Sequence, residues 1–90
     1  MNTRQLRVSG GTNVNRLSGA ILSVIDEGAI AELISIGAIA VNQAIKATIV
    51  AQGNGYKKGK ILTSQLSFTS VTLADGEKRD AIKITIRVPE

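Results

Sequence analysis

Residues 36–53 read IGAIAVNQAIKATIVAQG, and the interpretation of the whole chain depends on this stretch. Two glycines bracket fifteen residues that contain neither glycine nor proline and are mostly alanine and aliphatic residues. Such a segment predicts a helix with a defined start and stop. Val41, Ile45 and Ile49 recur at four-residue spacing and predict one buried stripe along this helix.

The few polar residues of this helix lie together near its middle. Asn42, Gln43 and Lys46 could contact bases, phosphates or a partner chain, or could simply form the solvated side of the helix. Ile39 and Val50 flank Asn42 and Lys46, and an exposed side this apolar favours an interface. We therefore predict a homodimer whose interface includes Ile39, Asn42, Lys46 and Val50.

The residues before this helix predict a strand and another helix. Residues 5–9 alternate around apolar side chains and are expected to form a short strand. Apolar residues recur at helical spacing over residues 14–25, and Thr12 or Asn13 can cap this helix at its N-terminus, with Asn15 as a later candidate. Gly19 lies in its middle, where glycine costs up to about 1 kcal/mol relative to alanine. Close packing against another backbone is the expected compensation.

Three further strands are expected. Residues 30–36 carry apolar residues on both faces, which suits a central strand. Residues 61–73 are rich in strand-forming residues, and a shift of the apolar register predicts a bulge near residues 69–70. The Asp75-Gly76 pair predicts a hairpin turn. Residues 81–88 then alternate, with the isoleucines and Val88 directed inward.

These elements predict the order β-α-β-α-β-β. Two strand–helix pairs in succession imply a right-handed crossover between parallel strands. Residues 53–60 contain three glycines and three lysines and are expected to be the least regular segment. We predict a single domain over residues 1–90 with an α+β fold, a two-layer sandwich in which both helices lie on one face of a four-stranded mixed sheet.

The composition narrows the classes of function. The chain has no Cys and no His, which removes disulfides, thiolate metal sites and the usual general base. Asp26 and Glu27 diverge at a helix end, so we expect no enzyme activity, no metal, no cofactor and no small-molecule substrate. No apolar run reaches the roughly 18–20 residues that span a bilayer, and the N-terminus lacks the apolar core of a signal peptide. We expect a cytoplasmic protein without a membrane partner.

The charge distribution favours a polyanionic partner. The net charge is +4, and the excess lies wholly in residues 46–90. Charge alone fits nucleic acid and an ordinary solvated surface equally well. The Gly-rich turn at residues 10–13 leads into a helix N-terminus, where backbone N–H groups favour an anion. Such turns more often have only a conformational role, so both interpretations stay open. The cationic candidates for phosphate contacts are Arg16 beside that turn, Lys46, the group Lys57, Lys58 and Lys60 next to Tyr56, and Lys78 and Arg79 near the hairpin tip.

Several motifs point together to one family. They are Val8-Ser9, Asn15, Gly19-Ala20, the run Gly37-x-x-Ala40-Val41-Asn42-Gln43-Ala44-Ile45-Lys46-Ala47, and Asp75-Gly76-Glu77-Lys78-Arg79-x-Ala81-Ile82-Lys83. Spread over nearly the whole chain, these motifs resemble the bacterial stage V sporulation protein S family, whose fold looks like that of the Alba chromatin proteins.

The resemblance implies an Alba-like dimer that binds DNA or RNA mainly through its phosphate backbone, with a possible role in gene expression or development. By position, it places Asn13, Asn15 and Arg16 on a binding loop before the first helix. It also places Lys78 and Arg79 on an arm formed by the last two strands.

The chain departs from the family pattern in the loop before the first helix. Gly11 and Val14 stand where the family usually has a lysine and a proline, so the loop loses a phosphate-binding charge. Arg16 offers a replacement nearby. The alternative to nucleic-acid binding is a regulatory protein–protein interaction module that presents the surface around Asn42 and Lys46.

Overall fold

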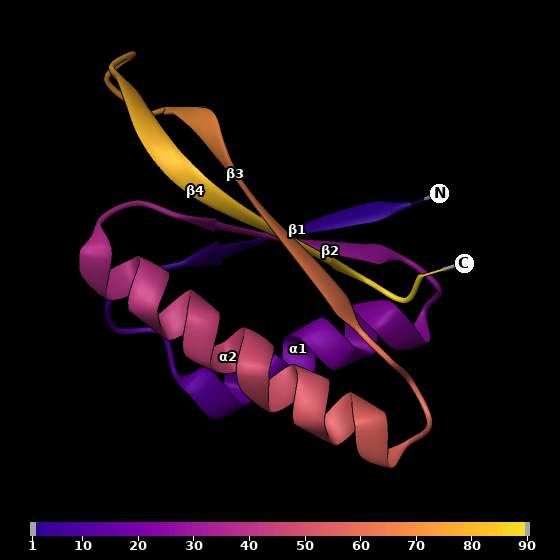
Figure 1. Cartoon of the computed structure of the whole chain (residues 1–90). Coiled ribbons are helices and arrows are strands. Elements are labelled where there is room, and N and C mark those ends of the chain that lie inside the picture. Colours follow the sequence, from indigo (N-terminus) through magenta and orange to yellow (C-terminus); the bar gives the residue numbers. More distant parts are fainter. Residues whose placement is uncertain (1, 90) are drawn as a thin grey trace.

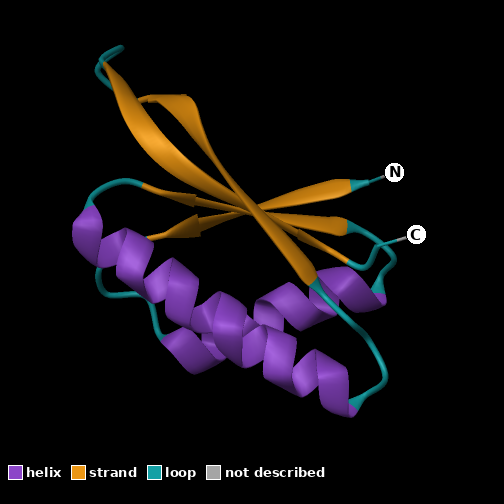
Figure 2. Cartoon of the chain, in the orientation of Figure 1, coloured by secondary structure: helices purple, strands orange, loops and turns teal. Residues whose placement is uncertain are grey.

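The computed structural model describes residues 2–89. The elements in order are β1 (Thr3–Val8), α1 (Val14–Asp26), β2 (Ile30–Ser35), α2 (Ala38–Lys57), β3 (Thr63–Thr72) and β4 (Lys78–Arg87). The four strands form one sheet in the order β1-β2-β4-β3, in which β1 and β2 are parallel and the other pairs are antiparallel. Both helices cover one face of this sheet, and the opposite face is open (Figures 1 and 2). The predicted α+β architecture is confirmed.

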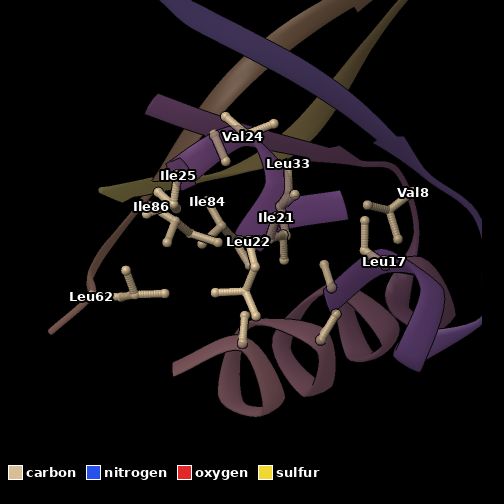
Figure 3. Close-up of a cluster of buried hydrophobic side chains, with 14 of the residues drawn as sticks. Val8, Leu17, Ile21, Leu22, Val24, Ile25, Leu33, Leu62, Ile84 and Ile86 are labelled. Carbon is tan, nitrogen blue, oxygen red and sulfur yellow. The ribbon is translucent and has the colours of Figure 1, made fainter. Parts of the chain in front are cut away.

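The main core lies between the helices and the central strands (Figure 3). Leu33 on β2 is paired with Ile84 on β4, and both side chains are almost wholly buried. Ile21 on α1 packs into the same cluster, which agrees with the helical spacing in the sequence. Asn13 is the residue that caps α1, since its side chain accepts a hydrogen bond from the backbone N–H of Arg16.

The buried stripe of α2 differs from the prediction. Val41 is only half-buried, and Ile45 and Ile49 are exposed, so they do not anchor the core. The residues that face inward at helical spacing are small, namely Ala40, Ala44, Ala47 and Ala51. Small side chains on α2 let it lie close to α1, which supplies the bulky ones. The aliphatic residues of α2 are therefore left for another surface.

The predicted helix end at Gly53 is wrong, because α2 continues to Lys57. Gly55 is buried inside this extension, and a Cβ added there would lie 3.3 Å from the backbone oxygen of Lys60 and 3.4 Å from Leu62. The glycine thus permits close packing of the following loop. The chain leaves the helix at Gly59, whose φ of +79° suits glycine.

The predicted bulge in β3 is also wrong. Its residues pair one-to-one with β4 along its whole length, from Thr63 with Arg87 to Thr72 with Lys78. The alternation of apolar residues shifts along β3 because the residues before and after position 69 pack on opposite sides of the sheet. Phe68 lies on the helix side, whereas Val71 packs on the opposite side in a second small cluster with Ile34 and Ala81.

Two smaller expectations also fail. Val88 lies beyond the end of β4 and is exposed. Gly19 is exposed, and a Cβ added there would meet nothing within 4 Å, so no neighbouring backbone requires a glycine at this position.

Candidate nucleic-acid interface

The loop between β1 and α1 is fixed by short-range hydrogen bonds. The backbone N–H of Ser9 donates to Thr12 Oγ1 at 2.8 Å, and the N–H of Thr12 donates back to the Ser9 carbonyl oxygen at 3.1 Å. Asn13 Oδ1 accepts from the Arg16 N–H at 3.0 Å, while Asn15 and Arg16 themselves are exposed. The loop therefore presents Asn15 and Arg16 to solvent from an ordered backbone.

Helix α2 holds this loop from the side. Gln43 Nε2 donates a hydrogen bond of 2.8 Å to the carbonyl oxygen of Thr12. The chain also approaches α2 closely at Gly10, where an added Cβ would lie 3.0 Å from Ile39 Cγ2. From the sequence, Gln43 could contact nucleic acid, contact a partner chain or lie on the solvated side of the helix. In the structure it tethers the loop.

The N-termini of both helices lie at the same end of the molecule. Each helix follows one of the two parallel strands, so each begins where its strand ends (Figure 1). Neither helix has an acidic residue in its first turn, and α2 has no side-chain cap on Gly37. The partial positive charges of the two helix ends are thus not offset by carboxylates in those turns.

The β3–β4 hairpin extends past the other strands at this same end. Pairing with β2 stops at Ile82, so residues 69–81 form a projecting arm on the side of the sheet away from the helices (Figure 1). At its tip, Gly76 has a φ of +87° and Asp75 Oδ1 accepts from the Glu77 N–H at 2.9 Å. This confirms the predicted hairpin turn.

The charges of the arm largely cancel. Arg79 Nε lies 3.1 Å from Glu77 Oε1, and Lys78 shares the tip with Asp75 and Asp80. The arm therefore offers shape and hydrogen-bonding groups more than a net positive charge.

The lysines at the C-terminal end of α2 and just after it, namely Lys57, Lys58 and Lys60, lie at the other end of the molecule. The 20-residue helix separates them from the β1–α1 loop by about 30 Å. Lys60 Nζ bonds Asp26 Oδ1 at 2.6 Å, and this hydrogen bond, together with the charges of Lys60 and Lys58, lowers the pKa of Asp26 below its usual range. Lys57 and Lys58 are exposed, and Lys46 is exposed midway along α2. The structure therefore does not gather all the candidate cations on one surface.

A hollowed surface lies between the arm and the ends of β1 and β2. We call it the arm-side groove; its lining residues are Gln5, Arg7, Ile34 and Thr69 to Thr72, and its volume is about 180 Å³. A second hollow of about 390 Å³ adjoins it and shares Arg7 and Ile34. No sequence motif marks this groove, because the curvature of the arm creates it.

An apolar surface remains exposed on the helix side of the molecule. Phe68 on β3 is 83% exposed and Ile49 on α2 is 60% exposed, with Ile45 and Leu66 beside them on the same elements. The two elements meet nearby, where Gln52 Nε2 donates to Ser64 Oγ at 3.1 Å. We call Ile45, Ile49, Leu66 and Phe68 the apolar seam. It adjoins a hollow of about 300 Å³ lined by Leu66, Ser67, Phe68 and Ile82.

Of the predicted dimer residues on α2, Asn42 and Lys46 lie one turn from Ile45 and Ile49. Ile39 and Val50 lie further round the helix, and Ile39 is next to Gly10 in the β1–α1 loop. Ile39 is 70% exposed, Asn42 and Lys46 are exposed, and Val50 is half-buried. Within residues 2–89, no group of three or more acidic side chains is placed to hold a metal ion. No helix in this described part is long and apolar enough to cross a membrane.

Comparison with known proteins places the chain. The fold resembles that of Alba from Thermoplasma volcanium, with a TM-score of 0.64 over 92% of this chain and 98% of that one. The sequence identity is 11%, so this likeness establishes a shared fold. Residues 4–89 match the family described as stage V sporulation protein S. Because this match covers nearly every residue, the chain belongs to the stage V sporulation protein S family.

Proposed function

We propose that this protein is a homodimer that binds DNA or RNA, chiefly through the phosphate backbone. The observation that carries the proposal is the meeting of two helix N-termini, both free of acidic residues in their first turns, at one end of the molecule. Backbone N–H groups and the helix dipoles favour anions at such ends. Arg16 adds a full positive charge beside them.

The elements around the two helix N-termini favour a long polyanion with a regular backbone, and not a small anion, as the ligand. The β1–α1 loop is ordered, so Asn13, Asn15 and Arg16 are presented without a large entropic cost. The arm projects at the same end, where Lys78, Arg79 and several hydroxyl groups can follow a phosphate backbone. Membership in the family and the Alba fold agree with this proposal.

The binding surface that we propose includes only some of the cationic residues that the sequence offers as candidates. Lys60 is held by Asp26, and Lys57 and Lys58 lie far from the loop and the arm. We assign them a secondary contribution through the general positive charge of the molecule. Lys46 borders the apolar seam and belongs to the proposed dimer interface.

The first experiment measures binding to duplex DNA, single-stranded DNA and RNA of matched length at physiological salt by mobility shift. We expect at least one of them to bind more tightly than about 10⁻⁴ M, the weak end of non-specific affinity. Weaker binding by all three contradicts the proposed function and favours the protein–protein interaction module.

We further propose that a second copy of the chain covers the apolar seam. β3 is an edge strand, and a long exposed edge with a hydrophobic residue such as Phe68 is an aggregation hazard unless something covers it. The flanking α2 residues Ile39, Asn42, Lys46 and Val50 would border the covered area. A domain of 90 residues also gains stability from such an interface, since it buries a modest core alone.

Phe68→Glu tests the dimer, with Val88→Glu as the control because Val88 is also exposed but lies beyond the end of β4, outside the apolar seam. Light scattering after size-exclusion chromatography should give a dimer for the wild type and the control, and a monomer for Phe68→Glu. Circular dichroism checks that each variant is folded. A wild-type monomer, or a Phe68→Glu dimer, contradicts the proposed interface.

A further inference from the structure

The arm-side groove exists because the hairpin bends over the open face of the sheet. β3 is separated from β1 by two other strands, yet Thr69 to Thr72 line the same hollow as Gln5 and Arg7. Packing of Val71 and Ala81 on Ile34 holds the arm in this position. The hollow is therefore part of the packed fold.

Arg7 is the cation of this groove. It alternates with Leu6 and Val8 on β1, which place their side chains toward the core, so Arg7 faces the open side. Among residues 2–89, no carboxylate lies within salt-bridge distance of Arg7. Arg4, on the other side of the strand, is paired, since its Nη2 lies 3.4 Å from Glu27 Oε2. Arg7 thus keeps an uncompensated charge at the groove.

The rest of the lining also suits an anion. Thr69, which lies on the same side of β3 as Val71, contributes a hydroxyl group that can donate a hydrogen bond, and no lining residue is acidic. Glu32, an acidic residue on this face, is already engaged by Gln5 Nε2 at 3.3 Å and by Lys83 Nζ at 3.7 Å. The Arg7 guanidinium and the Thr69 hydroxyl on a concave surface match the oxygen atoms of a phosphate.

We infer that Arg7 is a phosphate-binding residue and that a nucleic-acid strand passes through the arm-side groove. This inference rests on the proposed function and extends it. The strand would run from the β1–α1 loop, across the ends of β1 and β2, to the inner side of the arm. The second hollow, which shares Arg7 with the groove, continues this path toward Ser9 and the loop.

The test compares Arg7→Ala with Arg4→Ala in the full-length protein. The two arginines lie on the same strand but on opposite faces, so the pair controls for net charge. Fluorescence anisotropy with a labelled duplex and a labelled RNA is measured at several salt concentrations. We expect Arg7→Ala to weaken binding about tenfold and Arg4→Ala less than about twofold. In a dimer with two grooves, Arg7→Ala should also reduce, by about 2, the magnitude of the slope of the logarithm of the association constant against the logarithm of salt concentration. Arg7→Lys should leave this slope unchanged.

The outcomes separate this inference from the proposed function. No binding by the wild type overturns the proposed function and this inference together. Wild-type binding that is equally strong in Arg7→Ala overturns the inference alone. NMR of the Arg7 side-chain N–H with inorganic phosphate gives a further check. A saturable shift there, with unchanged nucleic-acid affinity in Arg7→Ala, identifies a free-phosphate site and also overturns it.

Discussion

Gln43 Nε2 on α2 donates a hydrogen bond of 2.8 Å to the carbonyl oxygen of Thr12, in the loop that precedes α1. This bond joins two surfaces that we propose to have different tasks. The loop presents Arg16 to nucleic acid, and the outer side of α2 contributes to the dimer seam. A partner chain docked on α2 would therefore stiffen the helix that positions the binding loop.

Gln43→Met removes the donor while nearly preserving the length of the side chain. A hydrogen bond contributes a net free energy of about 0.5–1.5 kcal/mol, so loss of loop order should weaken nucleic-acid binding by about two- to thirteenfold at most. Gln52→Met is the matched control, because Gln52 bonds Ser64 at the other half of the same helix. Equal affinities of the two variants would show that the tether has no role in binding.

Arg16→Ala should weaken binding more than the double variant Lys57→Ala/Lys58→Ala, although the double variant removes twice the charge. The reason is position, since Arg16 lies at the end where the helix N-termini and the arm meet. Anisotropy titrations with one duplex compare them, and the loss for Arg16→Ala should be about tenfold and similar across sequences. A larger loss for the lysine variant would move the binding surface to the C-terminal end of α2.

Gly19→Ala should stabilise the protein by about 0.5–1 kcal/mol, because alanine favours the middle of a helix and the added methyl group meets open space. Gly37→Ala provides the contrast, because Gly37 has a φ of +89° and alanine is strained there. This substitution should lower the free energy of unfolding of the protein. Urea denaturation measures both. Destabilisation by Gly19→Ala would indicate that a partner chain approaches this surface.

Acid should weaken the contact between Asp26 and Lys60. Because the pKa of Asp26 in the folded protein is lowered from 3.8, its contribution to stability is present above that value and is lost as pH falls through the lowered pKa. The melting temperature of the wild type should therefore fall more between pH 5 and about pH 2 than that of Asp26→Asn. Identical acid profiles would show that this ion pair contributes nothing.

The sequence predicted the fold well wherever one periodicity dominated. In α1 the large residues form a single stripe at helical spacing, and the helix followed correctly from it. The cap was left open between candidates, and the structure selects Asn13. In α2, alanines and larger aliphatics form two stripes of similar spacing. The larger residues looked like the core, but the distance between the helices selected the smaller ones.

The remaining errors arise from tertiary packing that no local pattern encodes. The sequence ended the helix at Gly53, whereas α2 continues past it, and the close approach of Lys60 and Leu62 explains the glycine at position 55. Phe68 and Val71 looked like a broken register because the strand leaves one core and enters another. Arg7 was overlooked for the same reason, since the groove beside it exists only once the arm bends over the sheet.

The most direct test of the central claim is the salt dependence of duplex DNA binding by the wild-type protein. If a dimer neutralises four to six phosphates, the logarithm of the association constant should fall against the logarithm of salt concentration with a slope of about −3.5 to −5. A slope near zero, or no measurable binding at low salt, would contradict a protein that recognises the phosphate backbone.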